Sequence, residues 1–242
     1  MYTGPNIARS GLVLSLDAAN VKSYPGSGTT WRDLSGNNNT GTLTNGPTFS
    51  SANNGSIVFN GSTQYVNNGN ILDTDGTSPF SVSVWFKTTS TLNGPLTLAS
   101  KCIINSPFTG WQLGFNTTTG NSGDIGKVGI ALVSSTTQVM RKITTALYNN
   151  GNWYNAVFTY NGSKTRAGML LYINGILPTI TESDSTSITN TISNAATYNI
   201  AGRNNGSQLF PGNIADVIHY NKVLSSSEIL QNYNALKSRY NL

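Results

Sequence analysis

Residues Phe80–Phe86 read FSVSVWF, a run in which every second side chain is large and apolar. Successive side chains of a β-strand point to opposite faces, so the apolar residues at 80, 82, 84 and 86 share one face. The same period of two returns in Trp111–Phe115 and Val128–Leu132, and Trp153–Tyr160 and Met169–Ile173 also have the composition of strands. The chain is therefore predicted to be built from β-strands with a buried apolar face.

The turn signals between these segments are Asn-Gly pairs, of which the chain has nine. Asparagine tolerates the left-handed backbone conformation and glycine has no handed preference, so such pairs close antiparallel hairpins. Their number favours a meander or Greek key over β-α-β units. No linker, composition shift or internal repeat divides the sequence, and residues 1–242 are predicted to form one domain.

The surface is predicted to be polar but poorly charged. Asp, Glu, Lys and Arg make up 10% of the 242 residues, whereas average domains have about 25%. The net charge of +5 reflects a shortage of acids, because the 14 basic residues are scattered along the chain. A nucleic-acid site needs clustered cations that displace counterions, so no nucleic-acid partner is expected.

Neither membrane insertion nor a disulfide framework is expected. No apolar run approaches the roughly 20 residues of a membrane span, and Met1–Asn6 lacks the apolar core of an export signal. Cys102 is the single cysteine, and its apolar neighbours predict a buried free thiol.

One helix is predicted, near the end of the chain. Ser225 and Glu228 have the spacing of a capping box, and Leu224 and Ile229 stand at the two positions of a hydrophobic staple. From Ile229 to Tyr240 apolar side chains repeat in steps of three and four, which predicts a stripe that packs against the sheets.

Four separated motifs follow one another along the chain. They are Gly11–Trp31, which begins GLVLSLDAAN, Trp31–Leu43 (WRDLSGNNNTGTL), Ile57–Val66 (IVFNGSTQYV) and Phe210–Ser225 (FPGNIADVIHYNKVLS). Together they resemble the laminin-G/concanavalin A-like family of jelly rolls. The resemblance implies an all-β sandwich of two antiparallel sheets, whose first and last strands lie side by side, with a short C-terminal helix.

The family includes glucanases, but this chain lacks a suitable pair of carboxylates. Glycoside hydrolysis uses two carboxyl groups about 5–10 Å apart across the scissile bond. The two glutamates, Glu182 and Glu228, stand in unrelated contexts, and Glu228 is already assigned to the cap. The single histidine, His219, lies in the last strand, and no nucleophile motif accompanies it. The protein is predicted not to be an enzyme.

A structural calcium site is predicted at the oxygen-rich loop from residue 33 to residue 41. Ca²⁺ takes about 6–8 oxygen ligands from carboxylates, amides and main-chain carbonyls. The resemblance implies that the first and last strands approach this loop, so that Asp17, Asp33, Asn38 and Asp216 would share one ion. The alternative is that Asp33 and its neighbours only cap a turn through side-chain-to-backbone hydrogen bonds.

Glycan binding would need an aromatic platform with arginine and amide groups beside it. Candidates on loops or strand ends are Tyr24, Trp111, Tyr148, Arg203 and Asn204. For each of them, packing in the core or at its rim is the competing explanation.

Two functions are consistent with the sequence. The first is a non-catalytic glycan-binding or adhesive module, of the kind that the resemblance associates with phage tail fibres and virion-decoration proteins. The second is a structural protein of the particle surface that contacts other virion proteins and binds no sugar. Both functions place the chain on a virion surface or, alternatively, outside a cell or on a bacterial cell surface. Both leave the formation of a homo-oligomer open.

Overall fold

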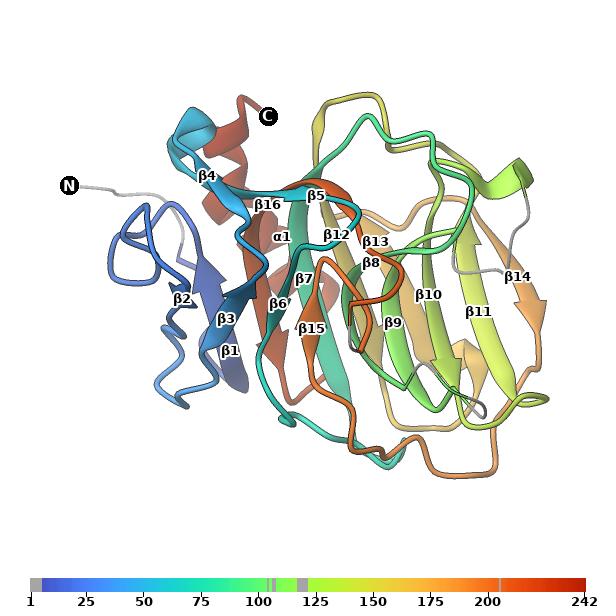
Figure 1. Ribbon diagram of the computed structural model, residues 1–242. Helices are drawn as coiled ribbons and strands as arrows, with labels where there is room; N and C mark the ends of the chain where they lie inside the picture. The colour runs from blue at the N-terminus through green and yellow to red at the C-terminus, as the bar shows by residue number, and fades with distance from the viewer. Residues whose placement is uncertain (1–5, 104, 106–107, 117–121, 205) are drawn as a thin grey trace.

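The computed structural model describes residues 6–103, 105, 108–116, 122–204 and 206–242 (Figure 1). Within these residues, seven strands form one antiparallel sheet and nine form a second. The order of strands in the first sheet is β13 (Met169–Ile173), β12 (Trp153–Tyr160), β7 (Phe80–Lys87), β16 (Pro211–Tyr220), β5 (Ser56–Asn60) and β4 (Thr48–Ser50), with β1 (Leu12–Asp17) also paired to β16.

The second sheet faces the first across the core (Figure 1). Its strand order is β14 (Ile180–Asp184), β11 (Val139–Thr144), β10 (Val128–Val133), β9 (Gly110–Phe115), β8 (Leu96–Cys102), β15 (Asn199–Ile200), β6 (Tyr65–Asn67), β3 (Gly41–Thr44) and β2 (Thr30–Trp31). Every pairing in both sheets is antiparallel. The two-sheet jelly roll predicted from the sequence is confirmed.

The core between the sheets contains the apolar faces that the alternation predicted. Phe80, Val82, Val84 and Phe86 of β7 all belong to it and are at most 3% exposed. They meet alternating side chains of the second sheet, such as Phe115, whose ring lies edge-on to that of Phe86. Burial of such side chains is the main favourable contribution to the stability of a sandwich of this kind.

The opposite face of β7 is buried as well, which the alternation did not predict. Trp85 belongs to a second apolar cluster between the seven-stranded sheet and the C-terminal helix. Ser81 on the same face is also buried. Its hydroxyl is satisfied there, because it donates to the carbonyl of Lys222 (2.8 Å) and accepts from the backbone N–H of Leu224 (2.9 Å). A central strand covered on both sides needs such satisfied polar groups among its apolar ones.

The helix α1 (Ser226–Leu236) begins where the capping box predicted. The Ser225 hydroxyl accepts from the backbone N–H of Glu228, and the Glu228 carboxylate accepts from the backbone N–H of Ser225. A short 3-10 turn, η4 (Lys237–Tyr240), continues it and stacks the Tyr240 ring on Trp85 at 4.3 Å between centroids. The other 3-10 turns are η1 (Ala52–Asn54), η2 (Ser122–Asp124) and η3 (Arg166–Gly168). None of the described helices is long and apolar enough to cross a membrane.

The first strand lies beside the last one, as the family resemblance implied. Leu16 is paired with Val217, and Asp17 is paired with Asp216. The pairing of β16 with β7 has an irregularity at Ala215, next to Asp216. A bulge of this kind changes the direction of the neighbouring side chains, and here both aspartates lie near the C-terminal turn η4.

Candidate functional site

A groove of about 360 Å³ opens on the outer face of the nine-stranded sheet. Its floor is formed by side chains that alternate with core residues along neighbouring strands: Gln112 of β9, Ala131 of β10 and Arg141 of β11. Phe108, Arg203 and Gln208, which belong to loops, form part of its walls. No helix among the described residues covers this sheet face, whereas α1 covers the outer face of the other sheet. We call this depression the outer groove.

An irregularity in β8 decides which of its side chains face the outer groove. The pairing with β9 shifts between Thr97 and Ala99, so that Lys101 comes opposite the core residue Trp111. Lys101 therefore extends into the interior and Cys102 lines the groove.

The Cys102 thiol is buried, as predicted, and burial raises its pKa to about 11, although the neighbouring Arg203 acts in the opposite direction. A thiol with this pKa is protonated at neutral pH and is a poor nucleophile.

The start of β9 is held tightly against β8 by a glycine. Gly110 has a φ of +134°, and a Cβ at this position would lie 2.0 Å from the carbonyl oxygen of Lys101. No other residue type fits such an approach. Phe108, two residues earlier, lines the wall of the groove.

The outer groove contains the chemical groups expected for recognition of a polar ligand with apolar faces. The Arg203 guanidinium lies over the Phe108 ring, 5.6 Å from its centroid. The Gln112 amide of the floor donates to Oε1 of Gln208 in the wall (2.9 Å), which links the two amides. Arg141 forms a 2.6 Å ion pair with Asp184 of β14. Aromatic, amide and charged groups thus converge in one depression.

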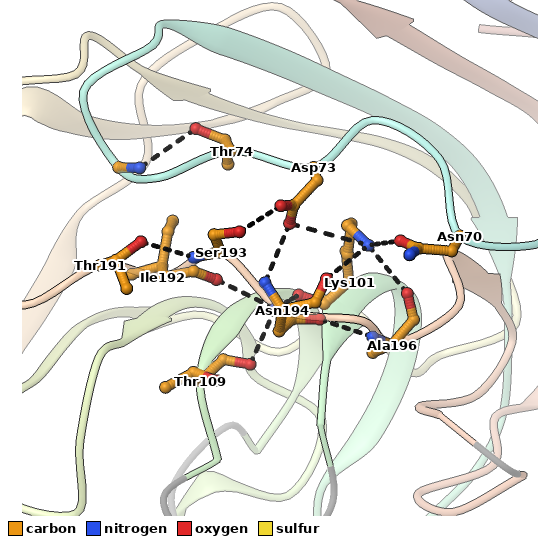
Figure 2. Close-up of polar contacts among 11 residues, drawn as sticks. Asn70, Asp73, Thr74, Lys101, Thr109, Thr191, Ile192, Ser193, Asn194 and Ala196 are labelled. Carbon is orange, nitrogen blue, oxygen red and sulfur yellow. Dashed lines mark hydrogen bonds and ion pairs between the residues drawn. The ribbon is translucent and has the colours of Figure 1, made fainter.

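The inward-facing Lys101 anchors a polar network at one end of the sandwich (Figure 2). Its Nζ donates to Asn70 Oδ1 (2.6 Å) and to the carbonyl oxygens of Ala196 (2.8 Å) and Asn194 (3.2 Å), while the Asp73 carboxylate lies 3.8 Å away. Burial lowers the pKa of Lys101, and Asp73 opposes this effect. Because each ammonium proton has an acceptor, we interpret this lysine as a structural tie and not as a reactive amine.

The same network supports the wall of the outer groove. The Asn194 side-chain amide donates to the carbonyl oxygens of Thr109 (3.1 Å) and Ile192 (3.0 Å), and its oxygen accepts from the Ala196 backbone N–H (2.9 Å). Figure 2 shows Thr109 held in this way from the loop that contains Asn194. Thr109 directly follows Phe108, so the network positions the aromatic side chain of the groove.

The predicted calcium loop forms a turn around Asp33. Its two carboxylate oxygens accept four hydrogen bonds: from the backbone N–H groups of Ser15 (2.9 Å), Ser35 (2.9 Å) and Asn39 (3.0 Å) and from the Ser35 hydroxyl (2.7 Å). Asn38 has a left-handed φ of 60° at the tip of the turn. These contacts match the turn-capping alternative considered for this loop.

The other two acids of the predicted set meet a cation that belongs to the protein itself. Asp17 Oδ1 accepts from Arg239 (2.8 Å) and from the Ala19 backbone N–H (2.9 Å), and Asp216 is its partner in the neighbouring strand. In the described part of the chain, no group of three or more His, Cys, Asp or Glu side chains could hold a metal ion. The expected set of three carboxylates is therefore not assembled, and these residues do not fit a Ca²⁺ ion.

Of the predicted glycan-binding residues, the structure places Arg203 and Trp111 at the outer groove. Trp111, however, is 1% exposed and its ring packs in the core against Phe80, so it cannot act as a platform. Tyr24 is also buried, with its hydroxyl bonded to the Gly28 carbonyl (2.9 Å). Tyr148 lines a separate hollow, and Asn204 accepts a hydrogen bond from Thr197 (3.2 Å). The structure thus brings only Arg203 to the groove with an accessible side chain.

The groove residues that were not predicted from the sequence include Phe108, Gln112, Arg141, Asp184 and Gln208. Gln112 could have been found, because it alternates with Trp111 and Leu113 and must lie on the opposite face. Phe108 lies outside any alternating run, between Pro107 and Gly110. An aromatic residue inside a turn-forming segment was the signal available there.

The two glutamates do not form a carboxylate pair with each other, because each is bound to other residues. Glu182 is ion-paired to Lys142 (2.9 Å) and Arg166 (3.1 Å), and the hydrogen bond from Lys142 lowers its pKa most. Glu228 is bound to Lys222 (2.6 Å) and to the helix cap. His219 is buried, and its ring packs against those of Phe80 and Tyr198.

The two antiparallel sheets with a short C-terminal helix form a jelly roll of the concanavalin A-like type. A family model described as the concanavalin A-like lectin/glucanases superfamily matches residues 60–230, and the chain belongs to this family. No curated protein matches the chain.

Solved structures with the same fold include binding domains of clostridial toxins. The binding domain of Paraclostridial Mosquitocidal Protein 1 is 19% identical, with a TM-score of 0.67 over 93% of this chain and 52% of that one. The binding domain of botulinum neurotoxin DC in complex with rat synaptotagmin II is 17% identical (TM-score 0.64; 93% and 52%). The ligand-binding domain of botulinum neurotoxin serotype D in complex with N-acetylneuraminic acid is 18% identical (TM-score 0.63; 93% and 51%). The chain spans about half the length of these structures.

Proposed function

We propose that this protein is a non-catalytic glycan-binding module that uses the outer groove as its binding site. The observation that carries the proposal is the convergence of Phe108, Arg203, Arg141 and the Gln112–Gln208 amide pair in one depression on an open sheet face. An aromatic ring can cover the apolar face of a sugar, while arginine and amide groups reach its hydroxyl oxygens. One of the toxin domains with the same fold was solved with a sugar, N-acetylneuraminic acid.

The groove can be tested with a glycan array followed by calorimetry on the glycans that bind. Phe108→Ala removes the exposed ring and should weaken binding about tenfold, which is about 1.4 kcal/mol. Leu147→Ala is the matched control, since Leu147 is an exposed apolar side chain that does not line the groove. Equal affinities of Phe108→Ala and the wild type would show that the groove is not the site.

A protein partner is the second candidate function. Ile176 and Leu177 in the turn after β13 are 66% and 58% exposed, and Leu230 of α1 lies against Gly175 of the same turn. Exposed apolar side chains that adjoin one another are typical of contact surfaces. Another of the toxin domains was solved with a protein, rat synaptotagmin II.

This second function would suit a component of a virion or cell surface, and it would also suit a homo-oligomer. Native mass measurement tests the latter: Ile176→Ser should convert an oligomer into monomers if this surface joins copies of the chain. An assembly that is unchanged by Ile176→Ser would exclude this surface as the interface.

A further inference from the structure

The outer groove has an excess of positive charge. Its charged lining residues are Arg141, Arg203 and Asp184. Asp184 is paired with Arg141 at 2.6 Å, whereas Arg203 forms no ion pair within the described residues. One guanidinium therefore stands at the wall of the groove without a carboxylate to balance it.

The polar groups of the two arginines are also incompletely satisfied. The Nε atoms of Arg141 and Arg203 are buried and have no hydrogen-bond partner among the described residues. A charged donor that is removed from water and left without an acceptor costs free energy, so most such groups in proteins are paired. The cation–π contact with Phe108 compensates Arg203 in part, but a ring face accepts no bidentate hydrogen bond.

We propose that the outer groove selects glycans that bear a carboxylate, and that Arg203 is the residue that recognises it. This inference rests on the glycan-binding function proposed above and specifies its ligand class. The planar guanidinium presents parallel N–H donors that match the two oxygens of a carboxylate. Phe108, which contacts Arg203, would place a stacked sugar ring next to the charge, and Gln112 and Gln208 supply amide groups in the same groove.

Polyanions fit the groove less well than a single carboxylate. A nucleic acid or a polyphosphate requires several cations in a row, and the groove contains one that is not paired. A sulfate ester shares the anionic chemistry of a carboxylate and also presents two oxygens to the planar donor pair of a guanidinium. Sulfated sugars are therefore a separate arm of the test.

The test compares acidic oligosaccharides with their own neutral forms by calorimetry. The probes are trigalacturonic acid and its carboxyl-reduced form, sialyllactose and its carboxyl methyl ester, and a sulfated tetrasaccharide and its desulfated form. We expect at least one carboxylated probe to bind ten times more tightly than its neutral form, with the difference shrinking at 0.5 M NaCl. Arg203→Gln should remove this difference and Arg203→Lys should restore only part of it, because lysine retains the charge without the planar donors.

Arg32→Gln is the matched control, since Arg32 is exposed and is not part of the outer groove, and the melting temperature of each variant confirms folding. Equal binding of acidic and neutral forms would overturn the inference while leaving the glycan-binding function intact. A preference for the sulfated probe alone would overturn the carboxylate assignment. If no probe and no array glycan binds, the proposed function itself fails, and the inference fails with it.

Discussion

Arg239 donates a 2.8 Å hydrogen bond to the carboxylate of Asp17, a residue 222 positions earlier in the chain. Asp17 is paired in turn with Asp216 across the antiparallel strands β1 and β16. The C-terminal turn thus places a guanidinium beside two neighbouring acids, the position in which the sequence suggested a metal ion. A cation supplied by the chain reduces the repulsion between carboxylates as a bound metal would.

The two hypotheses, Arg239 or a Ca²⁺ ion as the positive charge beside Asp17 and Asp216, predict different effects of a chelator on thermal stability. Because Arg239 already supplies the positive charge, we expect EDTA to leave the melting temperature unchanged. Arg239→Gln should cost about 1–3 kcal/mol of stability, because it leaves the buried Asp17 carboxylate without this donor. The calcium hypothesis predicts instead that melting falls with EDTA and recovers with Ca²⁺, and that Asp33→Ala abolishes this response. Thermal unfolding of the three proteins with EDTA and with Ca²⁺ separates the two.

Asp216 should make the protein less stable as the pH rises. Burial raises the pKa of Asp216 well above its usual range, and Asp17 adds to this effect while Arg239 opposes it. A raised pKa in the folded state contributes stability at low pH, and this contribution is lost as the pH rises through the raised value. Asp216→Asn cannot ionise, so its stability relative to the wild type should increase from pH 4 to pH 9. A difference in melting temperature that is constant over this range would contradict the assignment.

His219 should have the opposite dependence, on the acid side. Burial lowers its pKa from 6.5 to about 3, so the folded protein holds the imidazole neutral. Stability from a lowered pKa is present above pH 6.5 and is lost as the pH falls towards 3, by about 1.4 kcal/mol per pH unit. His219→Phe removes the titrating group, so the denaturant concentration at the midpoint of unfolding should change less between pH 6 and pH 4 than it does in the wild type. Identical slopes in wild type and variant would show that other groups determine acid unfolding.

Asn194 should affect ligand binding without touching the ligand. Its amide holds the Thr109 carbonyl, and loss of this bond frees the backbone next to Phe108. Asn194→Ala is expected to cost about 1–3 kcal/mol in stability and to weaken the binding of any groove ligand several-fold at a temperature where the protein is fully folded. Asn190→Ala, in the same loop but exposed, serves as the control. A variant that loses stability but retains full affinity would limit Asn194 to a structural role.

Hydrolytic activity is not expected. Glu182, the glutamate outside the helix cap, is ionised between Lys142 and Arg166, so it cannot donate a proton to a leaving group. Wild type and Glu182→Gln should both release no product from β-glucans, galactans or peptidoglycan. Turnover by the wild type that disappears in Glu182→Gln would refute this interpretation.

The strands were predictable because each one has its own local period, as β7 illustrates with Phe80, Val82, Val84 and Phe86. The burial of the second face of β7 could not be predicted from the strand itself, because that face is covered by the helix α1 (Ser226–Leu236) near the other end of the chain. Trp111 was offered as a binding residue although its alternation with Leu113 and Phe115 already indicated the core. The orientations of Lys101 and Cys102 could not be predicted from the local sequence. An irregularity between Thr97 and Ala99 reverses the alternation of side chains along β8, and it is seen only in the pairing with β9.

The pairing of β1 with β16 also determines when the protein can fold. Leu16 meets Val217 only after about 200 further residues have been synthesised, which takes roughly 10–40 s at about 5–20 residues per second. Until then β1 has no partner strand, and its apolar side chains are available to wrong neighbours. Contacts between such distant segments also slow the folding reaction itself. The native sandwich therefore forms only after β16 has been synthesised, and slow expression at low temperature should favour it over aggregation.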